Sequence, residues 1–131
     1  MMIKPSSLRS PLGHARGLGS AKNGTHHWWA QRLTALALIP LTAWIIYSIL
    51  GLADSSYVEF VTWLRNPLNV TLLVLMVAAT FHHAQLGAQV VLEDYVSNHA
   101  WRVGSVIAVK FVCAALAVLC IVSIIIVAFG R

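Results

Sequence analysis

The stretch LTALALIPLTAWIIYSILGLA, residues 33–53, has no charged side chain. A helix of about 20 apolar residues is long enough to cross the ~30 Å hydrocarbon layer of a bilayer. Two further segments are at least as long, Pro67 to about Leu92 and Val103 to Gly130, and Lys110 is the only charged residue of the last one. A surface helix of a soluble protein would show a polar face, which these segments mostly lack. The sequence therefore predicts an all-α membrane protein with three transmembrane helices.

The composition of the whole chain agrees with this prediction. Of 131 residues, 59% are hydrophobic and 10% are charged, whereas an average soluble domain carries about 25% charged residues. This apolar fraction excludes intrinsic disorder, and a chain this short forms one domain at most. Cys113 and Cys120 lie inside the third apolar segment, so a disulfide framework is not indicated.

The net charge of +5 comes from nine Lys and Arg residues against four Asp and Glu residues. The basic residues flank the apolar segments instead of forming one basic surface, so membrane topology explains them and nucleic-acid binding is not predicted. The part of the chain before residue 33 carries five of them and no acid: Lys4, Arg9, Arg16, Lys22 and Arg32. The positive-inside rule then places the N-terminus in the cytoplasm, together with the second loop, which joins the second and third apolar segments. We expect Lys110 to reach toward the same interface.

Two regions follow from this pattern. Residues 1–25 are predicted to form a flexible cytoplasmic leader, in which LGSAKNG is typical of turns. The leader either anchors to anionic membrane lipid or docks onto a cytoplasmic partner. Residues 26–131 are predicted to form the three-helix anchor, with spans at about 29–53, 67–93 and 103–129.

The second apolar segment carries polar residues that are costly in a membrane helix and that usually face protein, water or a cofactor. At 100° per residue, His83, Gly87 and Asp94 share one face of this helix. A second face carries His82, Gln85 and Gln89. Two polar faces predict two different neighbours.

The first face makes His83 a candidate haem ligand. A neutral imidazole is a common iron ligand, and its other nitrogen needs an orienting partner. Gly87, one turn later, removes a side chain where a flat macrocycle could lie against the backbone. On this helix alone, a hydrogen-bonding or proton-handling histidine is an equally valid interpretation.

Two further clusters lie near the ends of the spans. In GTHHWWAQR, residues 24–32, Arg32 and His26 form either a positive flank beside a tryptophan belt or a site for carboxylates such as haem propionates. In EDYV, residues 93–96, the hydroxyl of Tyr95 can donate to a quinone carbonyl, although tyrosine is also common at membrane interfaces. Asp94 is expected to have a cationic partner or to handle protons. Tyr95 follows His83 by twelve residues, which is ~18 Å along a helix.

The segment HHAQLGAQVVLEDYV (82–96), together with GTHHWWAQRLTALALIPL (24–41), resembles the small hydrophobic anchor subunit of succinate dehydrogenase, respiratory complex II, of the alphaproteobacterial type. The resemblance spans roughly residues 20–131. It implies a subunit that anchors succinate:ubiquinone oxidoreductase in the bacterial inner membrane, where electrons pass from succinate to ubiquinone in the respiratory chain and the tricarboxylic acid cycle. It also implies three partners, which are a cytochrome b anchor subunit, an iron–sulfur subunit and a flavoprotein subunit. This chain alone is then not catalytic.

The resemblance further implies roles for individual residues. Haem b is held between the two anchor subunits, and His83 is the axial ligand of the haem iron from this chain. Arg32 and His26 correspond to residues near the haem propionates. Tyr95 donates a hydrogen bond to the substrate ubiquinone, and Asp94 adjoins the quinone site and pairs with a basic residue of the other anchor.

Alternatives stay open at this point. A fumarate reductase anchor shares the same architecture. A non-redox scaffold or transporter subunit would use His82, Gln85 and Gln89 to line a packing or ion-conducting interface. His82 is also an alternative iron ligand, and the resemblance transfers no role to His27.

Overall fold

A computed structural model of the protein describes residues 22–130, with side chains from Gly24 onward. Most of the predicted leader, residues 1–21, lies outside the described residues. The described chain folds into four helices, α2 (Lys22–Gly51), α3 (Tyr57–Leu64), α4 (Pro67–Tyr95) and α5 (His99–Phe129). Three of them are long and apolar enough to cross a membrane. The prediction of an all-α chain with three membrane-length helices is confirmed.

The helices extend beyond the apolar cores that identified them. The membrane-length stretches are Gly24–Gly51, Pro67–Tyr95 and His99–Phe129, so the first and third begin before residues 29 and 103. Because α2 begins at Lys22, residues 22–25 of the predicted leader are helical. The third helix begins at His99 because the side chain of Asn98 accepts hydrogen bonds from two free N–H groups of its first turn.

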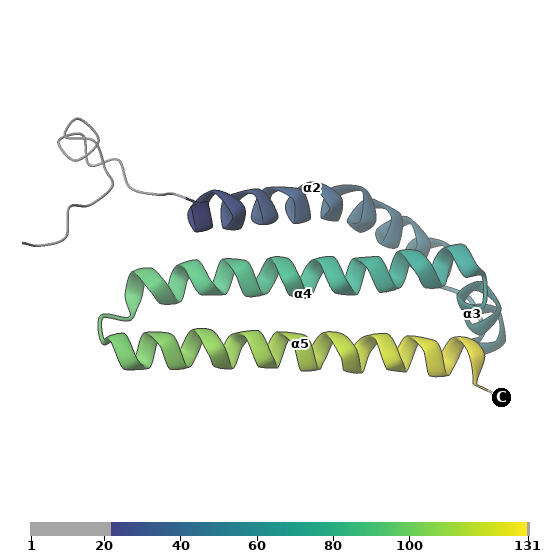
Figure 1. The fold of residues 1–131 in the computed structure, drawn as a ribbon. Helices are drawn as coiled ribbons and strands as arrows, with labels where there is room; N and C mark the ends of the chain where they lie inside the picture. Colours follow the sequence, from purple (N-terminus) through teal and green to yellow (C-terminus); the bar gives the residue numbers. More distant parts are fainter. Residues whose placement is uncertain (1–21, 131) are drawn as a thin grey trace, which may run out of the picture.

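The second long helix begins with two complementary signals. The side chain of Asn66 accepts a hydrogen bond from the N–H of Leu68 at 2.9 Å. Pro67 then occupies the first helical position, where a missing N–H costs nothing because no helical partner exists there. Within α2, Pro40 is accommodated in a continuous helix, which bends toward α3 (Figure 1).

The predicted spans leave residues 54–66 unassigned between the first and second helices, and the structure places helix α3 there. Ser56 caps this helix in a capping box, in which each of two residues binds the backbone of the other. The N–H of Ser56 donates to Oε2 of Glu59 at 2.7 Å, and the N–H of Glu59 donates to Oγ of Ser56 at 3.4 Å. The backbone N–H and then the hydroxyl of Ser56 hold the pKa of Glu59 below its ordinary value.

The three long helices form a single layer with α4 in the middle (Figure 1). Helices α2 and α5 pack on opposite sides of α4, and within the described residues they do not contact each other. The loop end of this layer is the end where α2 begins and α4 passes to α5. The α3 end is the opposite one, where α3 packs against both α4 and α5.

The tightest packing of the described chain is at the α3 end. Leu64, Val70 and Ala128 form a buried cluster there. Arg65 adds a link by donating from Nε to the carbonyl oxygen of Ala128 at 3.2 Å. On the long helices many large apolar side chains are exposed, and Phe111 is one example at 73%. In a membrane these surfaces would face lipid or other chains.

Candidate functional site

His83 lies on the side of α4 that faces α2, and its ring is half-buried. Its Nδ1 is 3.0 Å from Oγ1 of Thr34 on α2. The hydroxyl of Thr34 donates to the backbone of its own helix, at 2.8 Å from the carbonyl oxygen of Ala30 and 3.0 Å from that of Gln31. When the single hydroxyl hydrogen of Thr34 lies on either carbonyl, its oxygen accepts from the Nδ1–H of His83, so the direction of this bond depends on the tautomer of the ring. The tautomer with hydrogen on Nδ1 leaves the lone pair of the imidazole on Nε2.

Gly87 lies one turn after His83 and also faces α2. A Cβ atom added to this glycine would lie 3.6 Å from Nε2 of Gln31. The space that a macrocycle was expected to use is therefore covered by Gln31 in this structure. At the same interface, Oε1 of Gln31 and Nε2 of His27 are buried without a hydrogen-bond partner.

The second polar face of α4 lines a different space. His82, Gln85 and Gln89 border a pocket of about 280 Å³ whose other walls come from α2 and α5. Lys110 lines this pocket from α5. The remaining lining residues are His26, His27, Ala30 and Leu86. We call this space the polar pocket. The two polar faces of α4 therefore have different surroundings.

Arg32 and His26 have different surroundings in the structure. The guanidinium of Arg32 lies over the ring of Trp28, with Cζ 5.2 Å from the ring centroid, which is a cation–π arrangement. Both side chains are exposed. His26 lines the polar pocket, whereas Arg32 does not.

Asp94 and Tyr95 lie in the last turn of α4, at the loop end. Both side chains are exposed, Tyr95 to 82%. Nearby, at the start of α5, Nη2 of Arg102 lies 3.1 Å from Nδ1 of His99. The sequence analysis did not single out His99. This part of the loop end offers a phenol, an acid and a cation to another chain.

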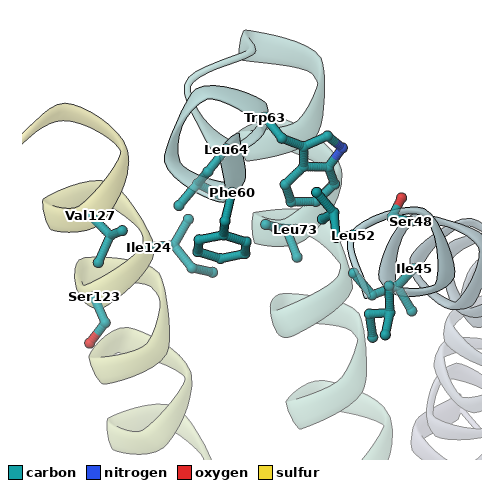
Figure 2. A pocket seen from close by; sticks show the side chains of 11 residues that line it. Ile45, Ser48, Leu52, Phe60, Trp63, Leu64, Leu73, Ser123, Ile124 and Val127 are labelled. Carbon is teal, nitrogen blue, oxygen red and sulfur yellow. The ribbon is translucent and has the colours of Figure 1, made fainter. Parts of the chain in front are cut away.

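A second cavity, of about 330 Å³, lies at the α3 end between all four helices (Figure 2). Its walls are apolar side chains except for Ser48 and Ser123. The hydroxyls of these serines donate to the carbonyl oxygens of Trp44 and Leu119 in their own helices. This cavity therefore presents apolar surface, and none of the predicted site residues lines it.

No three His, Cys, Asp or Glu side chains of the described residues gather into a metal site. The sequence analysis missed Thr34 and Gln31 as neighbours of His83 and Gly87. The contact between Thr34 and His83 joins residues 49 positions apart, so no local pattern announces it. The sequence analysis singled out Lys110 as a charge within an apolar segment. Its place in one pocket with His82 and Gln89 depends on how the helices pack.

Comparison with known proteins finds one family and several named relatives. Residues 6–126 match the family described as "Succinate dehydrogenase/Fumarate reductase transmembrane subunit". The chain is 39% identical over 125 residues to a protein of Rickettsia bellii named "Succinate dehydrogenase hydrophobic membrane anchor subunit", with 95% of this chain and 96% of the relative covered.

Two further relatives carry the same name. The chain is 37% identical over 107 residues to the protein of Rickettsia conorii, with 81% of this chain and 85% of the relative covered. It is 27% identical over 102 residues to the protein of Paracoccus denitrificans, with 78% of this chain and 79% of the relative covered. No solved structure matches the chain.

Proposed function

Because this chain belongs to the family of succinate dehydrogenase and fumarate reductase transmembrane subunits, we propose that it anchors a succinate:ubiquinone oxidoreductase in the bacterial inner membrane. Relatives that align along nearly their whole length carry the name of the succinate dehydrogenase anchor, which favours this enzyme over fumarate reductase. The partners are then a cytochrome b anchor subunit, an iron–sulfur subunit and a flavoprotein subunit. The basic residues before α2 favour a cytoplasmic N-terminus, which puts the loop end on the cytoplasmic side.

His83 is this chain's axial ligand to haem b in the proposal. The hydrogen bond from Nδ1–H to Thr34 at 3.0 Å carries this assignment, because it leaves Nε2 as the ligand atom and fixes the orientation of the ring. Nε2 of His27 and Oε1 of Gln31 are buried without a partner on α2, and haem binding would require Gln31 to leave its place beside Gly87. When bound, the haem supplies a one-electron redox centre. We place Arg32 and His26 near the haem propionates.

Tyr95 and Asp94 are this chain's part of the ubiquinone site in the proposal. The hydroxyl of Tyr95 donates to a carbonyl oxygen of the quinone, and Asp94 pairs with a basic residue of the other anchor subunit. Their exposure at the loop end supports this role, since the remaining walls of the site come from other chains.

The absorption spectrum of the purified complex tests the ligand assignment. We expect His83→Ala to remove the haem b signal, because no other residue replaces Nε2. His82→Ala is the matched control. His82 is the adjacent histidine, but it lies on the other face of α4 and lines the polar pocket, so its loss should leave the signal in place. An unchanged spectrum in His83→Ala, or a loss only in His82→Ala, would show that the ligand is wrong.

A further inference from the structure

Lys110 lies at a depth where a charged side chain needs a partner. It follows His99, the first residue of α5, by eleven positions, which is about 16 Å along the helix axis. The headgroup layer of a bilayer is roughly 5–8 Å thick on each side. With His99 at the outer edge of the headgroup layer, the backbone of Lys110 lies within the hydrocarbon thickness, where a lysine is costly unless it is paired or reaches water.

The acidic residues of this chain do not provide that partner. Asp54 and Glu59 lie at the α3 end, which is the end of the helix layer opposite the loop end. Glu93 accepts a hydrogen bond from Nε2 of Gln89 at 2.7 Å, and Asp94 is exposed at the end of α4. None of the residues that line the polar pocket is acidic.

The polar pocket instead presents hydrogen-bond donors and a cation. Gln85 and Gln89 carry amide N–H groups, Lys110 carries three ammonium hydrogens, and the pocket walls include three histidines. Nε2 of His27 is buried and has no partner in the structure. A carboxylate would accept hydrogen bonds from these donors. Hydrogen bonds between a cation and a carboxylate are stronger than those between neutral groups.

We propose that the polar pocket binds a carboxylate that another component of the assembled complex carries to this depth, with Lys110 as its counter-ion. A lipid phosphate belongs to the headgroup layer, and a free anion does not partition into the hydrocarbon. The carboxylate is therefore part of a membrane-embedded component, an Asp or Glu side chain on a membrane helix of another subunit. The proposal rests on the assembly of this chain into the proposed complex, but not on His83 being the iron ligand.

Carbodiimide coupling of the intact complex in its membrane identifies the source. Membrane-permeant dicyclohexylcarbodiimide activates a carboxylate, and the amine of Lys110 then displaces urea to form an amide without a spacer. We expect mass spectrometry to find Lys110 joined to an acidic residue of another membrane subunit, whereas an amide to a haem propionate alone would overturn the proposal. Lys110→Met should abolish this product. The adjacent variant Phe111→Met, outside the polar pocket, should retain it.

The thermal stability of the complex supplies a second readout. Lys110→Met should lower its dissociation temperature by several degrees, because a carboxylate is left unpaired, whereas Lys110→Arg should retain most of the stability and Phe111→Met all of it. A dissociation temperature that is unchanged or higher in Lys110→Met, with no amide in the wild type, would overturn the proposal. A loss of stability without any amide to a carboxylate would also overturn it and point to a phosphate. An amide to a protein acid together with an intact haem signal in His83→Ala would uphold this proposal while the ligand assignment fails.

Discussion

At the residue scale, His82 and His83 show how one position along a helix changes the chemistry available to a side chain. His83 is half-buried against α2 and bonds to Thr34. His82 is exposed and borders the polar pocket. The rotation of 100° per residue separates their surroundings. Of these two histidines, His83 has a ring nitrogen in contact with a side chain of another helix, and such a contact can orient an iron ligand.

The contact between Thr34 and His83 predicts a measurable effect on the proposed haem. Thr34→Val removes the acceptor for Nδ1–H at nearly constant volume, so the imidazole becomes a less basic and less well oriented ligand. We expect the purified complex to lose haem more readily, by roughly 10–100-fold in affinity, and the haem midpoint potential to rise.

Thr42→Val provides the control, because Thr42 is an exposed threonine of the same helix. Redox titration followed by optical spectroscopy measures the potential. Identical potentials and haem retention in the two variants would refute an orienting role for Thr34.

Tyr95 predicts a separation of two activities. Tyr95→Phe deletes the hydroxyl proposed to bind the quinone carbonyl and changes little else, since the side chain is 82% exposed. Removing one such donor costs about 10²-fold or more where it stabilises developing charge. Ubiquinone reduction by succinate should therefore fall, whereas succinate oxidation with an artificial acceptor should stay at the wild-type rate. The variant Tyr57→Phe, at the opposite end, is the control. Equal losses in both assays would rule out a quinone role for Tyr95.

At the element scale, short polar residues decide where α3, α4 and α5 begin. Asn66, Asn98 and Ser56 each accept backbone hydrogen bonds from the first turn that follows them, and these bonds satisfy N–H groups that have no partner within the helix. Hydropathy locates the apolar middle of a helix, so it placed the first and third spans too far inward.

The capping box of α3 predicts a pH dependence. The pKa of Glu59 lies below its ordinary value of 4.5 because the N–H and then the hydroxyl of Ser56 donate to its carboxylate. The group's contribution to stability is therefore complete above that ordinary value and is lost as the pH falls through the lower pKa of the folded state. Ser56→Ala should move the pKa part of the way back, because the backbone N–H remains.

Carbon-13 NMR titration of glutamate carboxyl groups measures this pKa, and Glu59→Gln assigns the resonance. An ordinary pKa in the wild type, or no upward change in Ser56→Ala, would contradict the capping box.

At the scale of the whole molecule, the chain is a layer that is closed at one end only. The two outer helices do not touch each other within the described residues, and each packs only on its own side of α4 (Figure 1). The buried cluster lies at the α3 end, where α3 packs against both α4 and α5. The exposed apolar faces and the polar pocket therefore leave much of the chain's surface for lipid and for other subunits to cover.

This uneven packing predicts that an alanine-to-leucine substitution has different effects on stability in the buried cluster and on an exposed helix surface. Ala128 is 1% exposed within the buried cluster, so Ala128→Leu should overpack it and lower the free energy of unfolding by about 1–3 kcal/mol. Ala115 is an exposed alanine of the same helix, and Ala115→Leu should change the stability little. Thermal unfolding followed by circular dichroism compares them. Equal unfolding temperatures would show that the α3 end is not the packed part.

Several features of this protein could be read from its sequence alone. They are the helical class, the three membrane-length segments, the polar set on the second of them, and the residues that resemble the family. Apolar length and helical spacing are local properties, and no tertiary contact is needed to express them. The capping box of α3 is equally local, since Ser56 and Glu59 have the required spacing. Apolar length alone does not indicate it, because both residues are polar.

Only the tertiary structure decided which local features meet. It placed α4 between α2 and α5, brought Thr34 to His83, covered Gly87 with Gln31, and set Lys110 in one pocket with His82. These outcomes depend on the pairing of helices and on the rotation of each about its axis. Residue spacing within one helix sets neither of them, because each is chosen by packing against residues far away in the chain.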